Sequence, residues 1–368
     1  MRAAVASATA LLVAAFLVTF APGASAASGW RVVPSPNPGP NVFLDSVAAS
    51  GPGDVWAAGY SRGAHDVLST LVEHWNGSTW SVVPSKNGGP GSAAFGGVAA
   101  IAPDDAWSVG DRNANKTLTE HWDGTAWSIV PSPNVGGIGG LSAVDAVSTD
   151  DVWAVGRATD ALIEHWDGRS WNVVRSPKRR VPLYGVSAIS SSDVWAVGEN
   201  LVEHWNGSTW QVATSAADSE LFAVGMASES DGWAVGRYDS VQPDRTVLPL
   251  TRIEHWDGSA WSVVPSPNAT IPGKPIANIL YGVAVASSTD VWAVGVDYDE
   301  ASGSYTRVLL EHWDGSAWSI VKSPKTDPPK ADLAAAVTIS PTDVWGVGHT
   351  ESTPDVGADQ TLTEHFSG

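Results

Sequence analysis

The chain has 368 residues, a formal net charge of −19 at pH 7, 20 tryptophans and no cysteine. The lack of cysteine excludes disulfides, thiolate nucleophiles and cysteine-ligated metals. The strong negative charge disfavours nucleic-acid binding by counterion release and attachment to an anionic membrane surface.

The first 26 residues are predicted to be a secretory signal peptide. Arg2 precedes an apolar stretch, and Ala24-Ser25-Ala26 fits a cleavage site of small residues. A membrane anchor is the alternative for this segment. No other stretch approaches the roughly 20 apolar residues of a membrane-spanning helix, so we expect no stable membrane insertion. Residues 27–368 are expected to form one secreted, extracellular, monomeric domain.

From residue 30 onward, a three-part sequence motif recurs seven times. Its first part is Asp-x-Trp-x-x-Gly, as in residues 54–59. Its second is Glu-His-Trp before Asn-Gly or Asp-Gly, as in residues 73–77, with Phe366 in place of the Trp in the seventh copy. Its third part is a Trp that opens an apolar run, as in residues 127–133. Dividing residues 30–368 by seven gives roughly 48 residues per unit, a period typical of propeller blades.

Each unit is predicted to hold four short strands. The gap between its first and second Trp varies, which indicates a surface loop, whereas the next gap is constant and indicates a tight turn. A two-residue type I′ turn at Asn76-Gly77 would pair Glu73 with Trp80 and His74 with Thr79. Alternation would then place Glu73 and the tryptophans on one face and His74 on the other, opposite a small residue.

The order of the parts predicts a closed ring. The repeats open with a lone fourth strand at residues 30–33, and the chain ends at residues 364–368, where a fourth strand would begin. We therefore predict an all-β, seven-bladed β-propeller with four antiparallel strands per blade, closed when residues 30–34 complete the last blade. The alternative is an open solenoid, which would need capping repeats that the sequence does not show.

The repeated polar residues are expected to be structural. Sheets that pack about 10 Å apart cannot bring Glu-His pairs of different blades within the roughly 2 Å of a metal–ligand bond. We expect each Glu to accept a hydrogen bond from an indole N–H, each His to bond across blades, and the tryptophans to pack between blades. The Asp of each Asp-x-Trp turn is expected to cap its turn. These aspartates are Asp54, Asp105, Asp151, Asp193, Asp231, Asp290 and Asp343.

No metal or cofactor is predicted. Residues 297–300 with Gly303 have a faint calcium-loop pattern but lack its full spacing and terminal Glu. The basic cluster at residues 178–180 is expected to be solvated. Gly-x-Ser-x-Gly and HExxH motifs are absent from the sequence.

These motifs carry a resemblance to known families. The segment Trp-Asn-Gly-Ser-Thr-Trp at residues 75–80, followed by a strand such as Asp-Val-Trp-Ala-Val-Gly at residues 151–156, resembles a kelch-type blade of the galactose-oxidase central domain. The Val-Trp-Ala-Val sequence also resembles tectonin-type lectin repeats. The chain is further similar to a class of secreted actinobacterial propeller proteins. The resemblance implies a propeller but not galactose-oxidase chemistry, which would require a Cys–Tyr crosslink.

The candidate site lies where the repeats diverge. In a propeller, the loops between second and third strands share a face with the loops between blades, and here both sets vary. Residues just past the Gly of each Asp-x-Trp-x-x-Gly mix Arg, Tyr, Asp and Glu, which suit a polar partner. The candidate ligand-binding residues are Tyr60, Arg62, Asp111, Arg112, Arg157, Glu199, Arg237, Tyr238, Asp297, Tyr298 and His349.

The first functional hypothesis is a non-catalytic binding propeller that recognises a glycan or cell-surface polymer on that face. The second is an extracellular glycan-active enzyme, a hydrolase or lyase, on the same face. The third is a protein-interaction scaffold. Carboxylate pairs about 5 to 10 Å apart near the central channel would favour the enzyme, and an exposed apolar patch would favour the scaffold.

Overall fold

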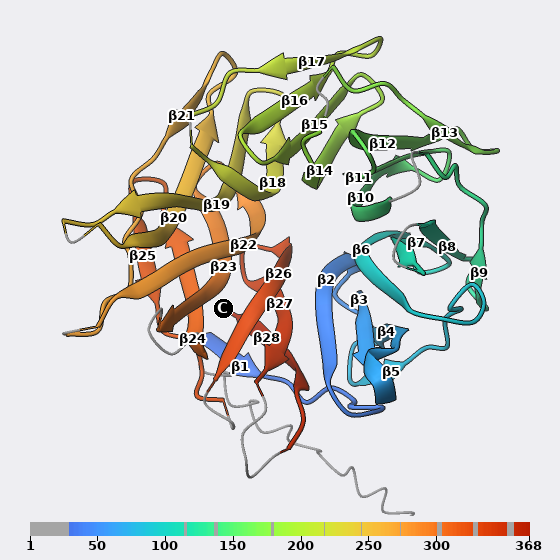
Figure 1. The fold of residues 1–368 in the computed structure, drawn as a ribbon, viewed down its shortest axis with the longest axis horizontal. Helices are drawn as coiled ribbons and strands as arrows, with labels where there is room; N and C mark the ends of the chain where they lie inside the picture. The colour runs from blue at the N-terminus through green and yellow to red at the C-terminus, as the bar shows by residue number, and fades with distance from the viewer. Residues whose placement is uncertain are drawn as a thin grey trace, which may run out of the picture.

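Seven four-stranded antiparallel sheets surround a central channel in the computed structural model (Figure 1). The structure describes residues 29–113, 116–135, 139–177, 180–216, 218–243, 245–272, 274–299, 304–326, 330–351 and 357–368. The predicted signal peptide therefore lies outside the described residues. Within them, the one helical element is the short 3₁₀ turn η1 (Ala64–Asp66).

Each of the first six blades uses four consecutive strands, from the channel outward. Blade 1 contains β2 (Val42–Gly51), β3 (Asp54–Arg62), β4 (Leu68–Trp75) and β5 (Trp80–Val82). Blade 2 contains β6 (Ala93–Ala102), β7 (Asp105–Arg112), β8 (Lys116–Trp122) and β9 (Trp127–Ile129). Blade 3 contains β10 (Gly140–Ser148), β11 (Asp151–Arg157), β12 (Ala161–Trp166) and β13 (Trp171–Val173).

The second half of the ring repeats this order. Blade 4 contains β14 (Leu183–Ser190), β15 (Asp193–Gly198), β16 (Leu201–Trp205) and β17 (Trp210–Ala213). Blade 5 contains β18 (Glu220–Ser228), β19 (Asp231–Val241), β20 (Val247–Trp256) and β21 (Trp261–Val263). Blade 6 contains β22 (Ile276–Ser287), β23 (Asp290–Asp299), β24 (Ser304–Trp313) and β25 (Trp318–Val321).

Blade 7 closes the ring and confirms the predicted closure. It contains β26 (Ala331–Ser340), β27 (Asp343–Thr350), β28 (Gln360–Ser367) and β1 (Gly29–Val32). β1 pairs with β28, with Trp30 opposite Phe366, and the Val33 N–H donates to the Thr363 carbonyl at 2.9 Å. Figure 1 shows the blue first strand lying beside the red last blade. The two ends of the ring are thus joined within one sheet.

Aromatic packing joins each blade to the next. The first Trp of blade 1, Trp56, is 1% exposed. Its ring centroid lies 4.2 Å from that of His74 in its own blade. It lies 5.1 Å from Trp122 and 5.3 Å from Trp127 in blade 2. The predicted inter-blade role of the tryptophans is therefore confirmed, because one indole is packed between its own His and two rings of the neighbouring blade.

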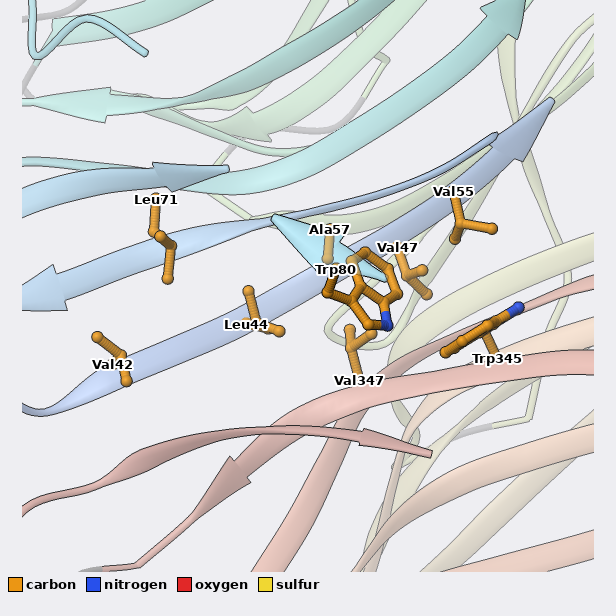
Figure 2. Close-up of a cluster of buried hydrophobic side chains, with 9 residues drawn as sticks. All are labelled: Val42, Leu44, Val47, Val55, Ala57, Leu71, Trp80, Trp345 and Val347. Carbon is orange, nitrogen blue, oxygen red and sulfur yellow. The ribbon is translucent and has the colours of Figure 1, made fainter. Parts of the chain in front are cut away.

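The last interface repeats this packing and adds aliphatic residues. Trp345 of blade 7 lies 4.9 Å from Trp75 and 5.3 Å from Trp80 of blade 1. Figure 2 shows Trp80 and Trp345 beside valines and Leu44 between the first and last blades. Burial of large rings is the dominant favourable term at such an interface.

The predicted hairpin register is wrong by two residues. β4 and β5 pair Trp75 with Trp80 and His74 with Ser81, so Thr79 is a loop residue and not the partner of the His. Because the error is an even number of residues, the predicted alternation still holds, and both tryptophans share one face.

The cause of the error is the Asn side chain that opens the turn. The Asn76 Oδ1 accepts hydrogen bonds from the backbone N–H groups of Ser78 and Thr79, both at 3.0 Å. Only Gly77 of the Asn-Gly pair has a positive φ, of 91°, whereas a type I′ turn needs two. The side-chain bonds therefore stabilise a four-residue loop.

Glycine is required in Asp-x-Trp-x-x-Gly by a close approach of two backbones. A Cβ on Gly59 would lie 2.1 Å from the Phe43 carbonyl oxygen, and one on Gly156 would lie 2.1 Å from the Gly140 oxygen. Beside each such glycine, the inner strand carries a β-bulge, as between Leu44 and Ser46. The repeat thus fixes a bulge at the same height in every blade.

Candidate functional site

The bulges place one extra residue of each inner strand on the wall of the central channel. All seven of these residues line it. We call them the bulge ring: Asp45, Gly96, Ser142, Tyr184, Phe222, Tyr281 and Ala334. They lie next to the glycines, near the end of the channel at which the variable loops meet.

The bulge ring is chemically asymmetric. Blades 4, 5 and 6 contribute Tyr184, Phe222 and Tyr281, whose neighbouring ring centroids are 5.5 and 5.6 Å apart. We call these three residues the aromatic arc. All three are half-buried, in contrast to the tryptophans of the blade interfaces. The other positions hold small residues and Asp45, and in a seven-membered ring blade 1 faces the arc across the channel.

Eight of the eleven predicted site residues lie just beyond the bulge ring. They occupy the first or third position after the glycine, so alternation turns them to one side of their strands. We call them the upper ring: Tyr60, Arg62, Asp111, Arg157, Glu199, Arg237, Tyr298 and His349.

Acidic residues gather beside the upper ring where blades 7 and 1 meet. We call Asp45, Asp332 and His349 the acidic pole. His349 Nδ1 lies 2.8 Å from Asp332 Oδ1, and the His349 ring lies 4.7 Å from that of Phe43. Phe43 also stacks on Tyr60 at 4.9 Å. Asp45 of the bulge ring lies close to this group.

Burial and neighbouring charges shift the pKa values of the groups in and beside the acidic pole. Burial, with the like charge of Asp332, raises the pKa of Asp45 to about 7, while His349 opposes the shift. Burial lowers the pKa of His349, but the hydrogen bond and charge of Asp332 outweigh it, so the net pKa is raised. Burial, followed by the charge of Asp45, raises the pKa of Tyr60.

Elsewhere in the upper ring, arginines lie near acidic residues. Arg237 Nε lies 2.7 Å from Glu220 Oε2. Burial raises the pKa of Asp111, and the nearby Arg157 opposes that shift. Burial and the charges of Glu220 and Glu199 raise the pKa of Tyr184, so these groups surround the arc.

The remaining three predicted residues point away from the upper ring. Arg112 donates to the Gly88 carbonyl at 2.8 Å, and Tyr238 carries the Arg252 guanidinium over its ring at 4.4 Å. Asp297 is 1% exposed and lies 2.5 Å from Arg307. Each occupies the second position after its glycine, and the sequence interpretation did not separate this position from its neighbours.

The predicted inter-blade role of the histidines is wrong. His204 Nε2 lies 2.7 Å from Asp193 Oδ1 in the same blade, and the other pairs have distances of 2.6 to 2.8 Å. The turn aspartates therefore anchor the imidazoles. The pairs are Asp54–His74, Asp105–His121, Asp151–His165, Asp193–His204, Asp231–His255, Asp290–His312 and Asp343–His365.

The glutamates, not the histidines, connect blades. Glu203 in blade 4 accepts from the Ser176 hydroxyl at 2.8 Å, and Ser176 lies in the segment that follows blade 3. Glu364 accepts from Ser323 at 2.9 Å in the same way. Among the described residues, no indole N–H donates to a glutamate carboxylate; Trp122 and Trp256, for example, donate to the backbone carbonyls of Pro103 and Glu229, each at 3.1 Å. The predicted Glu–indole bond is therefore wrong.

The structure also bears on the other charged motifs. Asp299 lies 2.8 Å from Lys274, so both described carboxylates of the calcium-like segment face cations, while residues 300–303 lie outside the described residues. Residues 178 and 179 of the basic cluster lie outside them too. Within the described chain, no cluster of His, Asp and Glu is arranged to hold a metal ion. None of its helices is long and apolar enough to cross a membrane.

Comparison with known proteins agrees with the fold. No protein family and no curated protein matches the chain. Among solved structures, the chain is similar to YCF48 bound to D1 peptide, with a TM-score of 0.60, 13% identity and coverage of 92% of this chain and 95% of that one. It is similar to the WD40 propeller domain of Doa1, with a TM-score of 0.61, 10% identity and coverage of 92% and 97%.

A third similar structure is YCF48 from Cyanidioschyzon merolae, with a TM-score of 0.57, 17% identity and coverage of 93% of this chain and 99% of that one. At these identities the likeness concerns the fold alone. The protein is a seven-bladed β-propeller.

Proposed function

We propose that the protein is a binding propeller that holds an extended polypeptide segment at the mouth of its central channel. The observation that carries this proposal is the aromatic arc. Phe222 is an apolar ring that is half-buried on a channel wall, flanked on both sides by tyrosines. Aromatic rings that remain partly exposed in a concave site are typical anchors for a partner.

Two further facts support a polypeptide ligand. Similar propellers include YCF48 bound to D1 peptide. The upper ring borders the arc with ionisable groups of both signs, such as Arg237 and Glu199. Such a border can satisfy the backbone and side-chain polar groups of a peptide while the arc takes an apolar side chain.

A glycan is the second candidate ligand. The same aromatic rings could stack on sugar faces, and the acid pair Asp45–Asp332 could protonate a glycosidic oxygen, because the pKa of Asp45 is raised to about 7 by burial and by Asp332. Glycan binding would fit a cell-surface role, and cleavage of the bound glycan would make the protein an enzyme.

Peptide display tests the proposal. Protein expressed from the full-length sequence is panned against random 12-residue peptides, and the selected peptides are compared on wild type, Phe222→Ala and Tyr238→Ala. Tyr238→Ala is the matched control because its ring packs on Arg252 outside the upper ring. We expect Phe222→Ala to weaken binding by at least 10-fold and Tyr238→Ala to leave it unchanged.

Other results would redirect the assignment. Peptide binding that is equally tight in wild type and Phe222→Ala would contradict a site at the channel mouth. Binding on a glycan array, without peptide binding, would favour the second candidate, and release of reducing ends from that glycan would establish the enzyme.

We also propose secretion, and a bacterial kelch-like origin for the repeat. The support is the sequence of residues 1–26 and the resemblance of the blade motifs. Mass spectrometry of the exported protein should find Ala27 at its N-terminus. Retention of residues 1–26 in a membrane fraction would indicate an anchor instead.

A further inference from the structure

The acidic pole brings the carboxylates of Asp45 and Asp332 close to one imidazole, that of His349. Asp45 forms no hydrogen bond or ion pair with another described residue, and it lines the channel. The imidazole of His349 is already bound to Asp332 at 2.8 Å. The Arg62 guanidinium lies over the Phe43 ring, 5.6 Å from its centroid.

The opposite wall has a different character. The aromatic arc offers ring faces, and Arg237 beside it is held by Glu220. An extended ligand that crosses the mouth would therefore meet carboxylates at one end and aromatic rings at the other. A whole-chain charge of −19 adds a long-range attraction for a cation.

We propose that the mouth selects a polypeptide segment in which a lysine or arginine lies close to an apolar or aromatic residue. The cationic side chain enters the acidic pole and binds Asp45, while the apolar side chain packs on the aromatic arc. This inference rests on the proposed function and specifies its ligand. It depends on the position of Asp45 on the channel wall, opposite the arc.

Neither the cationic nor the apolar side chain of the ligand would suffice alone. A lone cation at Asp45 would gain a charge-assisted hydrogen bond but would remain partly solvated. An apolar group on the arc alone would leave the Asp45 carboxylate near the like charge of Asp332. Occupying both places relieves the like-charge repulsion and removes apolar surface from water.

Synthetic peptides test the inference directly. Three acetylated and amidated hexapeptides are titrated calorimetrically into the full-length protein: one with Lys and Phe, one with norleucine in place of Lys, and one with Ala in place of Phe. We expect the Lys–Phe peptide to bind at least 10-fold more tightly than either of the others. In Asp45→Asn, the Lys and norleucine peptides should bind equally, with the weak affinity of the norleucine peptide for wild type.

A charge-reversing variant guards against a folding artefact. Asp45→Lys should prefer a Glu–Phe peptide over the Lys–Phe peptide, and circular dichroism should confirm that both Asp45 variants are folded. Ser142→Asn is a matched control at the equivalent bulge position of blade 3, and it should keep the preference for Lys.

The outcomes separate the two proposals. If peptides bind through Phe222 but Lys and norleucine are equivalent in wild type, the cation inference is wrong and the proposed function stands. If no peptide binds and Phe222→Ala changes nothing, the proposed function itself fails. If glucosamine oligomers bind in an Asp45-dependent manner and peptides do not, the cation site is correct and the polypeptide class is wrong.

Discussion

The indole rings of Trp30 and Trp292 meet edge to face, with their centroids 5.2 Å apart, across the interface between blades 7 and 6. Trp30 lies on the first strand of the described chain and Trp292 in its second half. Phe366 completes the group, 5.9 Å from Trp30 and 4.9 Å from Trp292. The ring is thus closed by backbone pairing and by the same aromatic packing that joins the other blades.

Trp30→Ala should open this closure. Truncation leaves a cavity against Trp292 and weakens the only strand that comes from the other end of the chain, so we expect a loss of about 3–5 kcal/mol in the free energy of unfolding. Urea denaturation measures it. Val32→Ala on the same strand is the control, because Val32 is 41% exposed and should cost little. Equal stability of Trp30→Ala and wild type would show that β1 is dispensable.

His204→Ala tests the histidine–aspartate pairs. The imidazole stacks on Trp195 at 4.2 Å and bonds to Asp193 at 2.7 Å, so its removal leaves a buried carboxylate without its partner. We expect a loss of about 1–3 kcal/mol, seen as a lower melting temperature. The exposed His65 offers the control, and His65→Ala should leave the melting temperature within error. A similar small effect for both variants would refute a structural role for the pair.

Gly156→Ala tests the backbone approach that makes the bulges. The new Cβ would lie 2.1 Å from the Gly140 carbonyl oxygen, so two strands must separate. Overpacking of this kind costs about 1–3 kcal/mol, and calorimetry should show it as a lower melting temperature. Gly39→Ala meets no atom within 4 Å and serves as the control. A tolerated Gly156→Ala would mean that the repeat does not depend on this contact.

The sequence repeat predicts the closed ring because the same motif is present in every blade. Seven copies of the motif, with a lone strand at one end, allow few arrangements other than closure. The hairpin register was not accessible in this way. Asn76 can support either a two-residue turn through its backbone or a longer loop through its side chain, and only the structure shows that its Oδ1 bonds Ser78 and Thr79.

The bulge ring could not be found from residue types. A bulge is a backbone feature, and its seven positions hold Asp, Gly, Ser, Tyr, Phe, Tyr and Ala. The signal that was present is the constant glycine, which marks where two strands touch and hence where the partner strand must skip a residue. The sequence alone could have shown that Asp111 and Arg112 do not belong to the same ring, because adjacent residues of a strand face opposite sides.

The buried glutamates should make stability fall as pH rises. Burial raises the pKa of Glu73, Glu164 and Glu311 from 4.5 to about 8, with small opposing effects of Ser35 and Ser132 on the first two. The folded state then binds more protons than the unfolded chain between about pH 4.5 and 8. This contribution is fully present below pH 4.5 and is lost as the pH rises through 8.

Glu311→Gln isolates this effect. Both carboxylate oxygens of Glu311 are buried without a hydrogen-bond partner among the described residues, so a neutral amide of the same shape avoids a buried charge. We expect the variant to be about 1–3 kcal/mol more stable than wild type at pH 8 and nearly equal at pH 5. Urea unfolding at the two pH values measures the difference. The exposed Glu229 provides the control, since Glu229→Gln should shift neither value. A loss of stability at pH 8 would mean that Glu311 is ionised and bound to a cation in the folded protein.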